Sequence, residues 1–258
     1  LSYEVLGYTS AEAADQYIQY KVKKRVAEKQ PHVPTSGIRR KPRIIIDNSN
    51  AHSDTNARVP KPELTLPAEV AEHLAQVYAQ ADTILEYGSG GSTVLASEMS
   101  SKRIFTVEND VKWAEKMRRY IEQEPHASPA IIHTVDIGAT GPWARPVDDT
   151  NWRAFHTYPL SVWDREDFVE PDVVLIDGRF RVACFVATLM KIKKPTIVLF
   201  DDYGDRDYYH QIERLAKPKQ LIGRMAHFEL VPGDIPRDEL TWMLASFNQV
   251  TYADNTRR

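Results

Sequence analysis

The sequence lacks the features that mark several classes of protein. Its 258 residues include one cysteine, Cys184, which excludes an internal disulfide and a zinc site built on several cysteines. No apolar run approaches the roughly 20 residues of a membrane span, and no secretory signal peptide is recognisable. We therefore expect no membrane partner, and we expect a cytoplasmic location.

Net charge of either sign is also small. The formal net charge is -3, with 42% hydrophobic and 27% charged residues, which is ordinary globular composition. No basic field covers the whole chain, so nucleic acid is not an expected partner. Basic residues nevertheless gather between positions 21 and 43, where nine lysines and arginines stand against one acid, Glu28.

This basic arm belongs to a predicted extension over residues 1–62, made of a helix near 10–29 and a linker, with the main α/β domain over 63–258. Ser10 is a suitable N-cap for the helix. The arm is interpreted either as a solvated helix and linker, or as a contact surface for phosphate, an acidic partner or a second subunit of a homo-oligomer.

An apolar run that ends in a glycine-rich turn is the central pattern of the main domain. Residues 83–86 are predicted to form a buried strand, 88–91 a tight turn and 94–99 a helix. Glycines let the backbone approach a ligand, and the free N–H groups of the helix start face it. A dinucleotide fingerprint would need glycine where Thr93 stands, and a P-loop would need a lysine that is absent.

Five successive predicted strands end in an acid. Near-continuous apolar strands separated by helices predict a doubly wound, Rossmann-like parallel sheet, whose ligands bind at the carboxyl ends of the strands. Glu108 follows Glu86 by 22 residues, which is the spacing at which an acid bonds ribose hydroxyls in such sheets. Two further long strands are predicted over 221–231 and 240–250. The strand-end acids are Glu86, Glu108, Asp136, Asp177 and Asp201, the last followed by Asp202.

The pattern Glu86-x-Gly88-x-Gly90 resembles motif I of the class I S-adenosylmethionine-dependent methyltransferases, and the resemblance extends over residues 67–252. It implies a seven-stranded, mostly parallel sheet with an antiparallel terminal strand, and S-adenosylmethionine as cofactor. It also implies that Glu108 holds the ribose and Asp136 the adenine edge, although an Asp that caps a loop would look the same. The implied cofactor site comprises Glu86, Gly88, Ser89, Gly90, Ser92, Glu108, Asn109, Asp136 and Ile137.

Within this class, the acids after the fourth and fifth strands resemble those of metal-dependent catechol-type and macrocin-type O-methyltransferases. This resemblance implies Mg²⁺ on Asp177, Asp201 and Asp202, where hard oxygen ligands suit the ion and the ion lowers the pKa of a substrate hydroxyl. The sugar enzymes carry a second acid just after the fourth strand, whereas this chain has Arg179, with Arg181 close behind.

The two arginines have two interpretations. They are predicted to hold an anionic substrate, a carboxylate or phosphate, together with Tyr203 on the substrate side, or else to form salt bridges to the acids after the fifth strand. Without a metal, Asp177, Asp202 and His156 are the candidates for a general base. The aromatic-rich segment 138–167 is interpreted as a wall of the substrate site or as a packing insertion.

The sequence thus predicts S-adenosylmethionine-dependent O-methylation of a small, anionic molecule. Two other classes stay open: an NAD-dependent oxidoreductase on a similar sheet, and a non-catalytic binding protein that keeps the methyltransferase fold.

Overall fold

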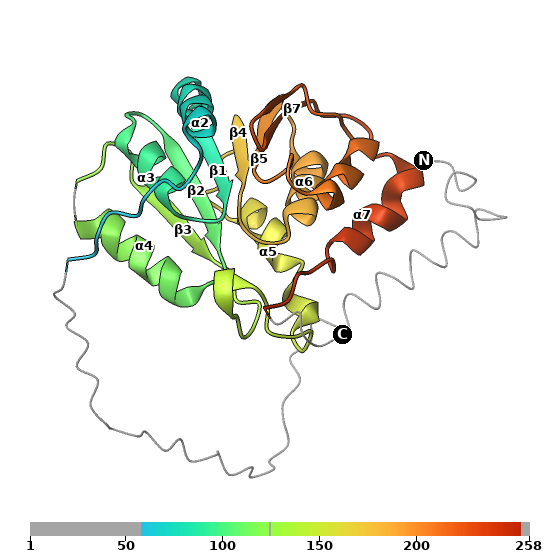
Figure 1. Cartoon of the computed structure of the whole chain (residues 1–258), viewed down its shortest axis with the longest axis horizontal. Coiled ribbons are helices and arrows are strands. Elements are labelled where there is room, and N and C mark those ends of the chain that lie inside the picture. The colour runs from blue at the N-terminus through green and yellow to red at the C-terminus, as the bar shows by residue number, and fades with distance from the viewer. Residues whose placement is uncertain (1–57, 124, 254–258) are drawn as a thin grey trace, which may run out of the picture. The chain divides into compact units, whose positions relative to one another are not determined.

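The computed structural model describes residues 58–123 and 125–253 (Figure 1). The predicted N-terminal helix and basic arm lie outside these residues. Their structure and the domain boundary at residue 62 therefore stay predictions.

Seven strands form one sheet in the order β3-β2-β1-β4-β5-β7-β6. β1 to β5 pair in parallel, and β7 runs antiparallel to both β5 and β6. The predicted doubly wound, mostly parallel sheet is confirmed. The strand order reverses between β1 and β4, which is where ligands bind in such sheets. The strands are β1 (Thr83–Tyr87), β2 (Arg103–Glu108), β3 (Ala130–Thr134), β4 (Val173–Ile176), β5 (Thr196–Phe200), β6 (Gln220–Ile222) and β7 (Met225–Leu230).

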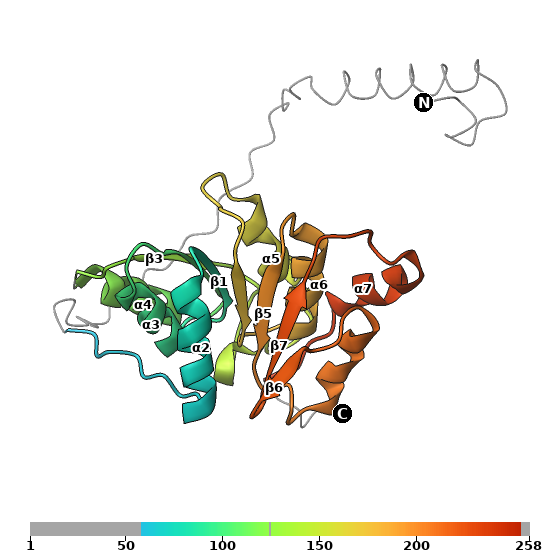
Figure 2. The ribbon, with the colours of Figure 1, turned by 90° about the horizontal axis from the view of Figure 1, so that it is seen from above.

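Helices cover both faces of the sheet: α2, α3 and α4 lie on one side, and α5 and α6 on the other (Figures 1 and 2). The α-helices are α2 (Ala68–Gln80), α3 (Gly91–Glu98), α4 (Val111–Gln123), α5 (Thr157–Leu160), α6 (Arg181–Lys191) and α7 (Leu240–Ser246). The 3₁₀ turns are η2 (Pro142–Ala144), η3 (Trp152–Ala154), η4 (Ser161–Asp164), η5 (Asp207–Arg214) and η6 (Arg237–Glu239). No helix in this described part of the chain has the length and apolar character that crossing a bilayer requires.

The residues of β1, β2, β4, β5 and β7 are divided between two separate hydrophobic cores. Leu85 and Tyr87 of β1 lie in the core that includes Phe185 of α6, whereas Ile84 lies in the core with Leu74 of α2. Strands buried on both faces must be apolar at nearly every position, which explains the continuous apolar runs of the sequence. Cys184 is fully buried in α6, as a core cysteine.

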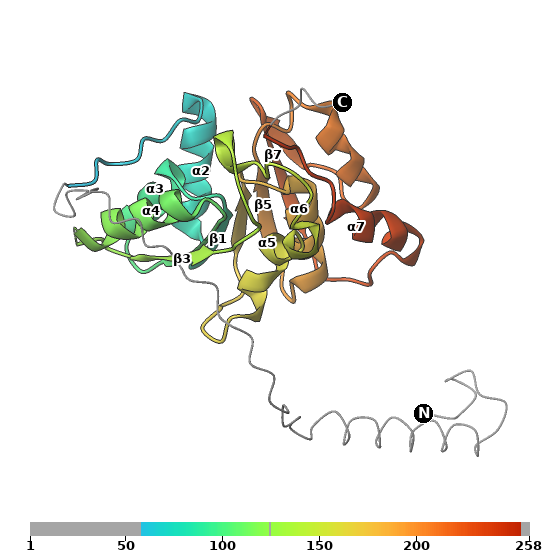
Figure 3. The same ribbon diagram turned by 90° about the horizontal axis from the view of Figure 1, so that it is seen from below.

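The C-terminal part differs from the prediction. The predicted strand over 221–231 is two short strands, because Gly223 adopts φ +53° and turns the chain between β6 and β7. The prediction of a strand over 240–250 was wrong, because that segment forms α7, which lies beside α6 (Figure 3). Its buried residues Met243, Ser246 and Phe247 follow the helical spacing of three and four.

The segment 138–167 contains short helical turns and is not structureless. It contributes Phe155, Tyr158 and Val162 to the core, and Pro146 to the wall of a pocket described below. The segment therefore packs against the sheet and also borders a pocket, so both interpretations of it have support.

Candidate active site

The turns after β1 and β4 touch each other. Gly88 has φ +102°, and a Cβ built there would lie 2.8 Å from the Cα of Gly178. A Cβ on Gly178 would in turn lie 2.8 Å from the backbone nitrogen of Gly88 and would overlap the Tyr158 hydroxyl. Only glycine fits either position, so the two turns form one rigid junction at the switch point of the sheet.

The glycine turn, residues 88–91, is linked by hydrogen bonds to the buried acid Glu86. The hydroxyl of Thr93 accepts the Gly90 N–H at 3.0 Å and donates to Glu86. The Tyr78 hydroxyl of α2 donates to the other Glu86 oxygen at 2.8 Å. Glu86 was predicted to contact a ligand, but the structure places its side chain fully inside the protein, where it shapes the turn.

Burial raises the pKa of Glu86 to about 7, against the lowering effect of the hydrogen bonds from Thr93 and Tyr78. Because the ordinary value is 4.5, the folded protein binds this proton more tightly than the unfolded chain. The stability that the neutral carboxyl contributes is fully present below about pH 4.5 and is lost as the pH rises through about 7.

We therefore predict that Glu86→Gln removes a pH dependence of stability. A shift from 4.5 to about 7 corresponds to about 3 kcal/mol, which wild type should lose relative to the variant as the pH rises from 4.5 to 8. Urea denaturation at several pH values measures this. Glu98→Gln is the control, because Glu98 is a half-exposed partner of Lys61. Parallel stability profiles of wild type and Glu86→Gln would contradict the assignment.

A second buried acid, Glu108, stands at the tip of β2 and is 6% exposed. One carboxylate oxygen accepts the N–H groups of Asn109 and Asp110, at 2.8 and 2.9 Å. The other accepts the Ser89 hydroxyl at 3.0 Å and the Ser89 N–H at 3.3 Å. Burial raises the pKa of Glu108, and these hydrogen bonds oppose the rise. The acid and the glycine turn are thus in direct contact across β1 and β2.

Asn109 follows this acid and carries an unused acceptor. Its Nδ2 donates to the Ala144 carbonyl at 2.7 Å, while its Oδ1 is buried and has no hydrogen-bond partner among the described residues. Unpartnered buried acceptors are rare, so this oxygen is suited to a donor on a ligand. Trp113 of α4, which the sequence reading did not single out as a site residue, donates its Nε1–H to the Ser89 carbonyl at 2.8 Å.

The residues after β3 have mixed placements. Asp136 is exposed, and its Oδ1 accepts the Gly138 N–H at 2.8 Å, which is the loop-capping geometry. Ile137 is buried in the core below it. Ser92, 8% exposed, lies in the first turn of α3.

These groups fit a nucleoside. A Cβ built on Gly90 would meet no atom within 4 Å, so a ligand can approach the backbone there. Beside that space stand the Glu108 carboxylate, which suits vicinal hydroxyls, and the orphaned oxygen of Asn109. The N-terminus of α3 adds free N–H groups at the same edge.

The three aspartates predicted to bind a metal do come together. Asp177, Asp201 and Asp202 each offer one oxygen, and these oxygens lie within 4.8 Å of one another. All three also pair with arginines. The guanidinium of Arg224 binds both oxygens of Asp201, at 3.0 and 2.8 Å.

Two more arginines complete this network. Arg181 contacts Asp177 at 2.9 Å and Asp202 at 3.1 Å, and Arg206 contacts Asp202 at 2.8 Å. Three guanidinium groups therefore balance three carboxylates, and a divalent cation would compete with them. Arg206 and Arg224 were missed from the sequence: Arg206 lies four residues after Asp202, and Arg224 lies between β6 and β7, inside the single strand predicted over 221–231.

Asp177 differs from the other two acids in its exposure. Its side chain is 37% exposed, against 12% for Asp202 and 1% for Asp201. Partial burial raises the pKa of Asp177 to about 7; Arg181 opposes the rise, and the negative charges of Asp201 and Asp202 add to it. A carboxyl with a pKa of about 7 can exchange a proton with a ligand near neutral pH, so Asp177 is a candidate base.

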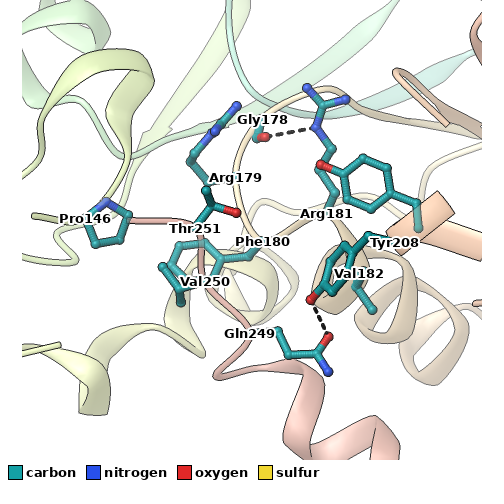
Figure 4. A pocket seen from close by; sticks show the side chains of 11 residues that line it. Pro146, Gly178, Arg179, Phe180, Arg181, Val182, Tyr208, Gln249, Val250 and Thr251 are labelled. Carbon is teal, nitrogen blue, oxygen red and sulfur yellow. Dashed lines mark hydrogen bonds between the residues drawn. The ribbon is translucent and has the colours of Figure 1, made fainter. Parts of the chain in front are cut away.

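A pocket opens beside the tip of β4 (Figure 4). Its walls are Pro146, the turn 178–182, Tyr208 and Tyr209 of η5, and the segment 249–251. Arg179 and Arg181, both predicted to face a substrate, line this pocket.

The other residues predicted for catalysis, metal or substrate are not among those that line this pocket: Asp177, Asp201, Asp202, Tyr203 and His156. Tyr203 is 1% exposed, and its hydroxyl donates to Glu213 at 3.0 Å. His156 is exposed at the start of α5.

Comparisons with known proteins found relatives among solved structures only. No family model and no curated protein matches the chain. Among solved structures, a methyltransferase-like protein from Silicibacter pomeroyi is 45% identical, with a TM-score of 0.69, over 73% of this chain and 98% of that one. O-methyltransferases from Streptomyces achromogenes and Bacillus cereus are each 18% identical, with TM-scores of 0.43 and 0.44. They cover 67% and 66% of this chain, and the matches span 83% and 82% of their own.

An identity of 45% over nearly the whole of the Silicibacter pomeroyi protein is enough to establish a family. The sheet order, the glycine turn after β1 and the acid at the tip of β2 agree with that relationship. The chain belongs to the class I S-adenosylmethionine-dependent methyltransferase superfamily.

Proposed function

We propose that this protein binds S-adenosylmethionine and transfers its methyl group to a hydroxyl oxygen of a small molecule. The observation that supports this most is the 3.0 Å hydrogen bond between Ser89 in the glycine turn and Glu108 at the tip of β2. It joins a backbone cradle to a pair of carboxylate oxygens, which is what a nucleoside attached to a charged amino-acid chain requires.

In this proposal the β1–β3 half of the sheet holds the cofactor. Glu108 accepts the two ribose hydroxyls after the Ser89 hydroxyl turns away from it. The backbone at Gly90 and the N-terminus of α3 hold the amino-acid end. Asn109 Oδ1 accepts one further donor of the nucleoside, and Asp136 accepts from the adenine amino group with the oxygen that does not cap its loop.

The β4 half supplies the proton chemistry. The cofactor, when bound, provides an electrophilic methyl group on a positively charged sulfur. Asp177 removes the proton of the acceptor hydroxyl, for which a pKa of about 7 is well suited. Arg181 orients that carboxylate through its 2.9 Å contact, and the transfer depends on how well the acceptor oxygen is aligned with the methyl group.

Calorimetric and thermal-shift titrations with S-adenosylhomocysteine and with NAD test the proposal. S-adenosylhomocysteine at a hundred times its Kd should stabilise the fold by about 2.7 kcal/mol, and NAD should have no effect. Stabilisation by NAD alone would favour an oxidoreductase. No response to either ligand would favour a binding protein that has kept the fold.

The arginine network around the three aspartates predicts that Mg²⁺ is not required. EDTA should leave the melting temperature and the affinity for S-adenosylhomocysteine unchanged, because Arg181, Arg206 and Arg224 already neutralise the acids. An Arg224→Met variant frees Asp201 and should gain Mg²⁺ affinity that calorimetry detects. A rise in the wild-type melting temperature with Mg²⁺, reversed by EDTA, would contradict this prediction.

A further inference from the structure

Two guanidinium groups near the β4 pocket have no anionic partner in the part of the chain that the structure describes. Arg181, Arg206 and Arg224 are all ion-paired. Within residues 58–123 and 125–253, by contrast, no carboxylate forms an ion pair with Arg145 or Arg179. Arg145 belongs to the segment before α5, and Arg179 to the turn after β4. Pro146, the neighbour of Arg145, lines the same pocket as Arg179, and the charge of Arg145 lowers the pKa of Arg179, so the fold brings together two charges that are distant in sequence.

Both groups are partly withdrawn from water. The Nε of Arg145 is buried and has no hydrogen-bond partner within residues 58–123 and 125–253. Burial lowers the pKa of Arg179, and the neighbouring charges of Arg181 and Arg145 lower it further. A buried cation without a partner costs free energy, and proteins normally satisfy such groups. Two of them together indicate a site whose missing partner is an anion.

The pocket beside these arginines has an aromatic wall. Phe180 and Tyr208 line it, and the Tyr208 hydroxyl is already used as a donor to Gln249 at 2.9 Å. In Figure 4 the guanidinium groups of Arg179 and Arg181 lie on the same side of the pocket and flank Gly178. Arg181 forms ion pairs with Asp177 and Asp202. The positive charges that can bind an anionic ligand are therefore those of Arg179 and the nearby Arg145.

The position of the pocket indicates whether the cofactor or the methyl acceptor binds there. Apart from Pro146, the lining residues come from elements after β4, including η5 and the segment 249–251. The nucleoside groups described above lie at β1, β2 and β3. The pocket is therefore on the acceptor side of the switch point, next to the proposed base Asp177.

We propose that Arg145 and Arg179 clamp an oxyanion, a carboxylate or a phosphate, carried by the methyl acceptor, whose ring packs against Phe180 and Tyr208. The inference rests on the proposed function, and it defines the acceptor as an aromatic hydroxy compound with an anionic substituent. The planar guanidinium groups can each bind such an oxyanion through two hydrogen bonds.

The test uses the full chain saturated with S-adenosylhomocysteine and titrated by calorimetry with phenyl phosphate, benzoate and benzyl alcohol. The two anions should bind and the neutral alcohol should not. Arg179→Gln and Arg145→Gln should each weaken anion binding by about tenfold to a hundredfold, which corresponds to one lost charge-assisted contact. Arg153→Gln is the matched control, because Arg153 lies in the same segment but is exposed over the Trp152 ring.

Folding controls keep the variants interpretable. Removing an unpaired, partly buried charge should not lower the melting temperature, so Arg179→Gln is expected to fold. If it does not, Arg179→Lys keeps the charge and loses the two-pronged geometry, and it should still weaken phenyl phosphate binding.

Three outcomes would overturn the clamp. The first is that neither anion binds to wild type. The second is that the Arg179 and Arg145 variants bind the anions as tightly as wild type does. The third is that these variants lose as much affinity for S-adenosylhomocysteine as for the anions. The last outcome would place the arginines on the cofactor carboxylate. If S-adenosylhomocysteine binds and the anions do not, the clamp fails and the proposed function stands. If the anions bind through the arginines and S-adenosylhomocysteine does not bind, the two arginines are an anion site and the proposed function fails.

Discussion

Replacing Glu108 with alanine is expected to weaken S-adenosylhomocysteine binding by about a hundredfold or more. The carboxylate is buried at the tip of β2, and in the proposed function its two oxygens accept the two vicinal ribose hydroxyls. A hydrogen bond to a charged group contributes about 1.5–3 kcal/mol, so the loss of two exceeds a factor of a hundred. Calorimetric titration of wild type and variant gives the ratio of dissociation constants.

This variant needs a control for helix fraying. Glu108 also accepts the N–H groups of Asn109 and Asp110 at the start of α4. Asp110 caps the same helix, because its Oδ1 accepts the Trp113 N–H at 3.0 Å. Asp110→Ala should cost about 1 kcal/mol of stability and leave ligand affinity unchanged. An equal loss of affinity in both variants would attribute the effect to the helix and not to a ribose contact.

Alanine substitutions at two glycines of the same turn are expected to affect different properties: fold stability at Gly88 and ligand binding at Gly90. At Gly88 the new Cβ would lie 2.8 Å and 2.9 Å from backbone atoms of Gly178, and the residue has φ +102°. Overpacking against backbone and the strained φ together should destabilise the fold by about 3 kcal/mol or more. Urea denaturation measures this loss.

At Gly90 the backbone is extended, with φ 173°, and a Cβ meets no atom within 4 Å. Gly90→Ala should therefore keep the stability of wild type. It should weaken S-adenosylhomocysteine binding about tenfold or more, because the methyl group enters the space through which a ligand reaches the backbone. Normal binding by Gly90→Ala would show that the cofactor does not pass over this turn.

The sequence was most informative where a pattern has one physical cause. Strands buried on both faces must be apolar throughout, so β1, β2, β4 and β5 were visible as runs that end in acids. The segment from Leu240 to Ser246 was wrongly predicted as a strand because Thr241, Trp242 and the following Phe247 are residue types that favour strands. The helical spacing of its buried residues would have indicated a helix. The turn at Gly223 could have been found, because a lone glycine inside a strand pattern often marks a break.

The site was harder to predict than the sheet. The salt bridge of Arg181 to Asp202 was one of the two interpretations of the arginines, and it is present. The contacts of Arg206 and Arg224 with these acids were not foreseeable, because they depend on how the segments after β5 and β6 fold back over the strand ends. Glu86 shows the same limit. Its position in the motif suggested contact with a ligand, whereas the alternation of β1 turns its side chain toward Tyr78 of α2. No local pattern marks Arg145, which matters only because the fold brings its charge close enough to lower the pKa of Arg179.

The contact between the turns after β1 and β4 has a consequence for engineering acceptor preference. Gly178 borders the β4 pocket, and a mutagenesis library aimed at that pocket would ordinarily include it. Any side chain there would strike the Tyr158 hydroxyl and the backbone of Gly88, so such library members would lose their fold before their selectivity could change. Diversity is better placed at Gln249, which lines the same space on the side away from the junction.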